Sequence, residues 1–226
     1  MRIDLHTHTA PASDCSAISH REYVDFCRRA GIRAIALTNH GEIADNQLLA
    51  PRLADIGVAL LHGVEISTML GDFLVFSSDL DYLDTLHDVQ APLKQAEVPP
   101  HAAIVWAHPA AGGGRSGSAY FSGMGHLVAG AVHAIEVYNG SWQGNRYVEA
   151  ARALAGELGL PMTGGSDAHR AQDLMTCYTE VAGRVRDTGD LVAALRAGAV
   201  QAGRQRKHLF RRRPEETAPP RERERR

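Results

Sequence analysis

The chain lacks the features that would place it in a membrane or outside the cell. It has no run of about 18 apolar residues, so we expect no membrane-spanning helix. The first strand-like segment begins at Arg2, which leaves no room for a signal peptide. Its three cysteines, Cys15, Cys27 and Cys177, are odd in number and widely spaced, which indicates free thiols in a reducing compartment. We therefore predict a cytoplasmic protein without a membrane partner.

The chain also lacks a strong net charge, although its charges are unevenly placed. The formal charge is −2, yet residues 204–226 carry ten basic residues against four glutamates, which leaves −8 for residues 1–203. This basic tail has few apolar residues, so we expect it to be disordered. Nucleic-acid binding by the tail is the alternative, but glutamates interrupt its positive charge and no aromatic residue follows Phe210. We place one globular domain at residues 1–203.

The body of the sequence shows a regular alternation of apolar and amphipathic segments. Patterns typical of strands lie at residues 3–6, 34–37, 58–64, 73–76, 103–106, 135–138 and 161–163. Helical patterns lie at residues 19–30, 43–56, 82–96, 143–158 and 190–197, the first with a capping box of Ser19 and Glu22 and a terminal Gly31. Seven strands alternating with helices predict an α/β fold of parallel units, a closed or nearly closed TIM-like barrel. A doubly wound open sheet is the alternative, but the sequence has no Gly-x-Gly-x-x-Gly loop to support it.

Twelve histidines are the compositional feature that needs an explanation. His6 and His8 would project from the same face of the first strand, because side chains alternate along a strand. Other predicted strands also end in metal-ligating side chains, namely His40, Glu65, His108, Asp167 and His169. The carboxyl ends of barrel strands form one rim, where barrel enzymes place their active sites. Imidazole and carboxylate ligands suit Zn²⁺, Mn²⁺ or Fe²⁺, and clusters of such ions commonly hydrolyse phosphate esters.

These segments together resemble the PHP (polymerase and histidinol phosphatase) family of metal-dependent phosphoesterases. The resemblance extends from Asp4 to about Thr179 and includes motifs in the family's order. They are Asp4-Leu5-His6-Thr7-His8, Ser13-Asp14, Thr38-Asn39-His40, Gly63-Val64-Glu65-Ile66-Ser67, Ala107-His108-Pro109, Ile135-Glu136-Val137-Tyr138-Asn139 and Gly165-Ser166-Asp167-Ala168-His169. The resemblance implies a distorted (β/α)7 barrel, which agrees with the seven predicted strands.

The resemblance further implies up to three metal sites, so we expect two or three divalent ions. The ligands would be His6, His8, Glu65 and Asp167 for the first ion, Glu65 and His108 for the second, and Asp14, His40 and His169 for the third. Two positions depart from the family pattern. Asn39 stands where the family often has Asp, which could retune His40. Residues 71–76 lack the family's histidine, so water or Asp72 would complete the second site, or that ion would be absent.

The activity implied by the resemblance is hydrolysis of a phosphomonoester or a short phosphodiester by a hydroxide bridging the ions. Glu65 and Asp167 would hold these ions and are therefore predicted to be catalytic. His169 or His40 would protonate the leaving oxygen, although a ligated histidine is a poor acid and bound water could replace it.

The substrate is less sharply defined than the reaction. Arg115, in a glycine-rich loop after His108, and Arg170 are candidates for contacting a phosphate. Arg115 is also predicted to be catalytic, because it would help to balance charge on the equatorial phosphoryl oxygens. The short connections suggest an open site that takes a small phosphorylated metabolite or the end of a short oligonucleotide. The alternatives are a non-catalytic metal-binding module of the same family and a metal-dependent hydrolase that acts on a C–N bond.

Overall fold

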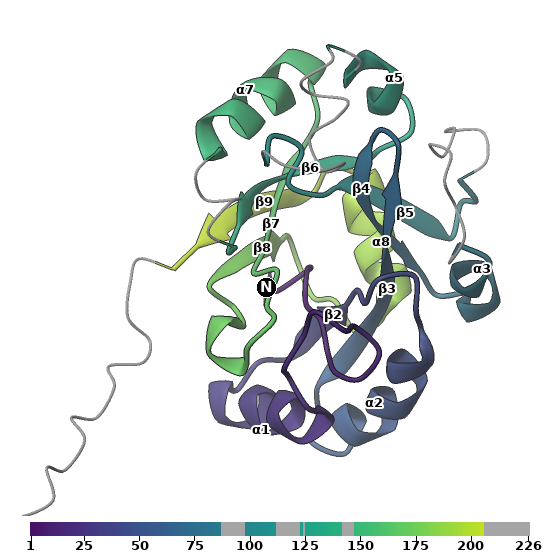
Figure 1. Cartoon of the computed structure of the whole chain (residues 1–226), viewed down its shortest axis with the longest axis vertical. Coiled ribbons are helices and arrows are strands. Elements are labelled where there is room, and N and C mark those ends of the chain that lie inside the picture. The colour runs from purple at the N-terminus through teal and green to yellow at the C-terminus, as the bar shows by residue number, and fades with distance from the viewer. Residues whose placement is uncertain (87–97, 112–122, 124, 142–146, 206–226) are drawn as a thin grey trace, which may run out of the picture.

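The strands of the computed structural model, which describes residues 1–86, 98–111, 123, 125–141 and 147–205, form two sheets around a barrel (Figure 1). The larger sheet has the order β2-β3-β4-β5-β6-β7 and the smaller one β1-β8-β9. The strands are β1 (Arg2–Ile3), β2 (Ala34–Leu37), β3 (Ala59–Thr68), β4 (Gly71–Ser77), β5 (Ala102–Trp106), β6 (Ala134–Asn139), β7 (Met162–Gly165), β8 (Cys177–Val181) and β9 (Val200–Arg204). The helices are α1 (His20–Ala30), α2 (Ala44–Ala54), α3 (Leu80–Asp84), α5 (Gly125–Ala129), α7 (Val148–Leu158), α8 (Thr188–Arg196) and the 3-10 helix η2 (Ala171–Asp173).

Residues 4–8 close the barrel between the two edge strands of the larger sheet. Next to β2, the Thr38 N–H donates to the Thr7 carbonyl at 3.0 Å. Next to β7, the Asp167 N–H donates to the His6 carbonyl at 2.8 Å. Because this short segment pairs on both sides, the ring of strands is complete, and the predicted distorted TIM-like barrel is confirmed.

The prediction that all strands are parallel is wrong for β4. This strand pairs antiparallel with β3 and with β5, whereas β2–β3, β5–β6 and β6–β7 are parallel. The reason is the two-residue turn between β3 and β4, since a turn this short can join only antiparallel strands. Thr68 stabilises it, because its hydroxyl accepts from the Leu70 N–H at 3.0 Å and donates to the Gly71 carbonyl at 3.0 Å.

Strands β8 and β9 are absent from the seven strands that the sequence predicts. They pair antiparallel with each other, and β8 pairs antiparallel with β1. Strand β9 is half-exposed and contains Gly203, whose bare Cα packs against the Tyr178 ring, so its pattern is not the alternation typical of a strand. Among the described residues, the helix predicted at residues 143–158 begins at Val148. Most of the helix predicted at residues 82–96 lies outside the described residues, and so does the tail from residue 206.

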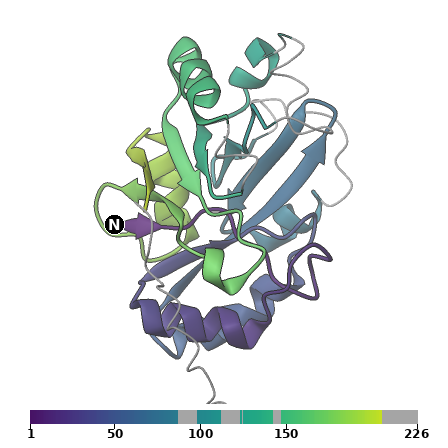
Figure 2. The same ribbon diagram turned by 60° about the vertical axis from the view of Figure 1, so that its left-hand side comes forward.

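The first helix ends as its sequence predicts. Ser19 accepts from the Glu22 N–H, and the Glu22 carboxylate accepts from the Ser19 N–H at 3.0 Å, which is the predicted capping box. Gly31 adopts the left-handed conformation, with φ of 62°, that terminates the helix. Helices α1 and α2 cover one side of the barrel, while α5 and α7 cover the opposite side (Figures 1 and 2).

The apolar core has an inner and an outer part that alternate along the strands. In β5, Ala103 and Val105 belong to the inner cluster together with Leu191 of α8. Ile104 and Trp106 belong to an outer cluster that includes residues of α7. The period of two follows from strand geometry, because successive side chains point to opposite faces of a sheet. No helix among the described residues is both long and apolar enough to cross a membrane.

Candidate metal centre

Four side-chain atoms lie close together in a first group, two from the segment after β1, one from β3 and one from the residues after β7. His6 Nε2 lies 3.2 Å from Glu65 Oε2 and 3.5 Å from Asp167 Oδ1. His8 Nε2 lies 3.3 Å and 3.4 Å from the same two oxygens. Ligands of a tetrahedral Zn²⁺ at about 2.1 Å lie roughly 3.4 Å from one another. The four separations therefore match the spacing of ligands around one such ion.

The extended segment before the site places both of its histidines on one side. His6 and His8 are fully buried, whereas Thr7 between them points the other way. The Thr7 hydroxyl donates to the Ala36 carbonyl at 2.6 Å and lies 2.8 Å from the Tyr23 hydroxyl. Alternation along an extended chain therefore brings the two imidazoles together, as the spacing predicts.

A second group shares Glu65 with the first. His108 Nε2 lies 3.3 Å from Glu65 Oε1, while Glu65 Oε2 faces His6 and His8. The two oxygens of one carboxylate thus face different groups, which is the arrangement of a bridging ligand. Asp72, at the start of β4, has its Oδ2 3.9 Å from His108 Nδ1. Strand β4 therefore places a carboxylate, that of Asp72, beside the second group.

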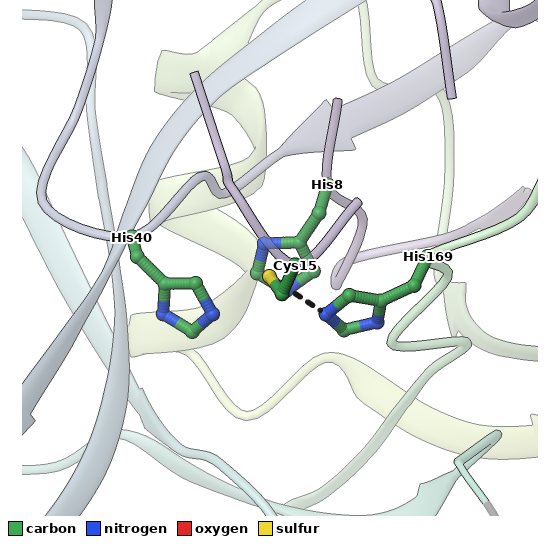
Figure 3. Close-up of side chains that lie close together, drawn as sticks. All are labelled: His8, Cys15, His40 and His169. Carbon is green, nitrogen blue, oxygen red and sulfur yellow. Dashed lines mark hydrogen bonds between the residues drawn. The ribbon is translucent and has the colours of Figure 1, made fainter. Parts of the chain in front are cut away.

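The third group combines His40, His169, Cys15 and His8, and the ring of His8 lies between those of His40 and His169 (Figure 3). The ring centroid of His8 lies 4.7 Å from that of His40 and 4.6 Å from that of His169. Asp14, predicted to be a ligand here, is exposed and belongs to none of the three groups found among the described residues.

Two predicted phosphate contacts have different outcomes. Arg115 lies outside the described residues. Arg170 is exposed and directly follows His169, at the start of η2. Arg170 is therefore open to solvent and adjacent in the chain to a member of the third group.

Glu136 is a buried carboxylate beside the ligand groups, and the sequence pattern alone assigns it no role. It is buried in the middle of β6, and its Oε1 accepts from His6 Nδ1–H at 3.1 Å. Its Oε2 accepts from the His108 N–H at 3.1 Å and from Asn139 Nδ2 at 2.9 Å. A carboxylate that holds Nδ1–H of a histidine fixes the ring so that the other nitrogen, Nε2, is oriented toward a metal. The available signal was a single carboxylate inside an otherwise apolar strand, since such a group is rarely buried without a partner.

Two further buried side chains hold the segments that carry the ligands. Asp4 accepts from the backbone N–H of Ser166 at 2.8 Å and of Met175 at 2.7 Å. Asn39 accepts from the Thr9 N–H at 2.8 Å and from the Ser13 hydroxyl at 3.0 Å. Asn39, which stands where the family often has Asp, thus holds the loop after His8 through hydrogen bonds of a neutral amide.

The pKa values of the site residues reflect burial together with opposite charges. Burial lowers the pKa of His8 to about 4, so this imidazole is neutral. Burial also lowers the pKa of His108, but the hydrogen bond and charge of Glu65 outweigh it and raise that pKa to about 9. Burial raises the pKa of Asp167, yet His6 and His8 bring it well below its ordinary value. A metal ion must displace the proton of His108, so binding releases protons.

The donor set fits a metal. Buried atoms without a hydrogen-bond partner include His6 Nε2, His8 Nε2, Glu65 Oε2 and His108 Nδ1, and the first three belong to the first group. Unsatisfied buried polar atoms are costly, each by about 1–3 kcal/mol, so their convergence requires a compensating ligand. His108 and Asp167 also have positive φ angles of 28° and 52°, a backbone strain that is common at functional sites.

We expect Gly165→Ala to disturb this site through packing alone. A methyl group at Gly165 would overlap the His6 Cβ and lie 2.6 Å from Glu136 Oε1. Overpacking of this kind costs about 1–3 kcal/mol, and the displaced His6 should bind zinc less tightly. Chemical denaturation and calorimetric zinc titration measure the two effects. Gly156→Ala is the control, because no atom lies within 4 Å of its added methyl group in α7 and alanine should stabilise that helix. Equal stability and equal zinc affinity of the two variants would contradict the packing argument.

Two family models match most of the chain. One is described as the PHP domain and matches residues 4–111. The other is described as PHP-associated and matches residues 145–200. The first includes the segments of His6, His8, Glu65 and His108, and the second includes Asp167 and His169. A comparison with curated proteins finds no match.

Several solved structures share the fold. PsfC from Pseudomonas syringae PB-5123 is 22% identical, with a TM-score of 0.65 over 90% of this chain and 91% of that one. A protein of Bifidobacterium adolescentis ATCC 15703, described as a candidate metal-dependent phosphoesterase, is 17% identical, with a TM-score of 0.53 over 75% of this chain and 88% of that one. An amidohydrolase from Chromobacterium violaceum, solved with bound sulfate and no metal, is 18% identical, with a TM-score of 0.56 over 77% and 90%. At these identities the likeness establishes the fold.

Proposed function

The chain belongs to the PHP domain family, and from this premise we propose that it is a metal-dependent phosphoesterase that hydrolyses a phosphomonoester or a short phosphodiester. The observation that carries the proposal is the shared carboxylate. Glu65 Oε2 lies 3.2 Å and 3.3 Å from the two histidines of the first group, and Oε1 lies 3.3 Å from His108 of the second. Adjacent metal sites of this kind are the usual device for displacement at phosphorus.

Two or three divalent ions (Zn, Mn or Fe), when bound, would supply Lewis acidity and a neutralising charge for the phosphoryl oxygens. The chain's own residues keep the metal-ligating side chains in position. Glu65 keeps the first two groups together, and Glu136 fixes the ring of His6 and the backbone of His108. Asp167 adds the second carboxylate of the first group. Both Glu65 and Asp167 are therefore assigned to the catalytic machinery.

The substrate approaches over the third group, because exposure increases in that direction. The side chains of His6 and His8 have 0% exposure, whereas that of His169 has 33% and that of His40 has 46%. His169 donates Nδ1–H to the Asp167 carbonyl at 2.8 Å, so its Nε2 carries the lone pair. An exposed rim next to Arg170 suits a small phosphorylated metabolite or the end of a short oligonucleotide.

Phosphate release from a panel of phosphomonoesters and short diesters tests this proposal. The protein would be stripped of metal and reloaded with Mn²⁺ or Zn²⁺, and a panel of amides would be assayed in parallel. We expect metal-dependent phosphate release that a chelator abolishes. Metal-dependent turnover of amides alone would instead indicate hydrolysis of a C–N bond. Metal binding without turnover of either panel would indicate a non-catalytic module.

A further inference from the structure

Cys15 occupies the place in the third group that was predicted for a carboxylate. Its Sγ lies 3.1 Å from His169 Nε2 (Figure 3). One ligand atom from each of Cys15, His40, His169 and His8 can be chosen so that all lie within 4.8 Å of one another. These atoms are therefore close enough to share an ion.

The loop after His8 turns Cys15 toward the histidines and Asp14 toward solvent. Ser13 is buried, and its hydroxyl donates to Asn39 Oδ1 at 3.0 Å. On the other side of Cys15, the Ala17 N–H donates to the His169 carbonyl at 2.9 Å. Anchored at both ends, the loop leaves Asp14 exposed and brings the thiol to His169.

The orientation of His169 is that of a metal ligand. Its Nδ1–H is donated to the Asp167 carbonyl at 2.8 Å, which places the lone pair on Nε2, the atom that faces Cys15 Sγ. His8 is the fourth member of this cluster, and its ring centroid lies 4.7 Å from that of His40 and 4.6 Å from that of His169. The thiol and an imidazole lone pair thus converge within a cluster that contains three imidazoles.

We propose that Cys15, and not Asp14, is the ligand of the third metal site together with His40 and His169. The inference rests on the metal-binding part of the proposed function and not on the nature of the bond that is hydrolysed. On binding, the thiol proton is released to solvent and the thiolate sulfur forms the bond to the ion. A thiolate with two imidazoles is a softer ligand set than one with a carboxylate, so this site should favour Zn²⁺ over Mn²⁺.

Cobalt substitution tests the ligand directly without measuring activity. The metal-free full-length protein would be titrated with Co²⁺, and the near-ultraviolet band of sulfur-to-cobalt charge transfer would be recorded. Zinc content after dialysis would be measured on the same preparations. We expect the wild-type protein to show the band, and Cys15→Ser to lose the band together with about one equivalent of zinc.

Asp14→Asn is the matched control, because Asp14 is the neighbouring candidate ligand. It should keep both the band and the zinc. Zinc should also slow alkylation of Cys15 by iodoacetamide in the wild-type protein, since Cys15 is exposed while Cys27 and Cys177 are buried. A wild-type protein without the band, a band that survives in Cys15→Ser, or zinc lost from Asp14→Asn but retained in Cys15→Ser would overturn the proposal. None of these results depends on turnover, so they distinguish the ligand assignment from failure of the phosphoesterase proposal.

Discussion

Asp167→Asn is expected to lower metal-dependent phosphate release by about 10³-fold, which corresponds to roughly 4 kcal/mol of transition-state stabilisation. The Asp167 carboxylate belongs to the first group, with its Oδ1 3.5 Å from His6 Nε2 and 3.4 Å from His8 Nε2. Asparagine removes its negative charge without changing the shape of the side chain. It also tolerates the positive φ of 52° at this position, so the fold should persist. Single-turnover phosphate release with Mn²⁺ or Zn²⁺ loaded measures the effect.

Asp55→Asn is the matched control for this substitution. Asp55 is an exposed carboxylate at the end of α2 and does not belong to any of the ligand groups. Its variant should retain wild-type turnover, and both variants should unfold at similar denaturant concentrations without metal. Unchanged turnover in Asp167→Asn would remove this carboxylate from the catalytic machinery.

Glu136→Gln should weaken metal binding by about 10–100-fold, the usual effect of changing a residue that orients a metal ligand. Both carboxylate oxygens of Glu136 accept hydrogen bonds, Oε1 from His6 Nδ1–H and Oε2 from the His108 N–H and Asn139 Nδ2. An amide has only one oxygen, so in either orientation its NH₂ group faces a donor. The ring of His6 then loses the partner that fixes its tautomer. Calorimetric titration of the metal-free protein with Zn²⁺ measures the loss.

Glu180→Gln is the control for Glu136→Gln, because it makes the same chemical change on the surface. Glu180 forms an exposed ion pair with Arg2 at 2.9 Å, and such pairs contribute little to stability. The Glu180→Gln variant should bind zinc with the same affinity as the wild-type protein. An unchanged affinity in Glu136→Gln would mean that this carboxylate does not hold the ligands in place.

Those parts of the protein that depend on neighbours in the sequence were predictable. The capping box of Ser19 and Glu22 and the terminal Gly31 follow from side-chain and backbone chemistry within a few residues. The convergence of His6 and His8 follows from the period of an extended chain. The gathering of Glu65, His108 and Asp167 at one rim follows from the rule that barrel strands end on the same side.

Other features depended on contacts between distant segments and could not be predicted from local pattern. The direction of β4 was misjudged, because its short apolar sequence suits a strand of either direction and only its pairing with β3 and β5 distinguishes them. The role of Glu136 lies in its contact with His6, 130 positions away. A sequence pattern shows that such a carboxylate is unusual but not which donors surround it.

The sequence by itself thus determined the family, the barrel and the ligand chemistry, because these depend on the motifs at the strand ends and on the types of residue found there. Only the tertiary structure decided which of the adjacent residues Asp14 and Cys15 faces His169. That choice depends on the turn that Ser13 and Asn39 fix, and on the hydrogen bond from Ala17 to the His169 carbonyl. Adjacent side chains in a loop point in directions set by such long-range hydrogen bonds, and no periodicity in the sequence specifies them.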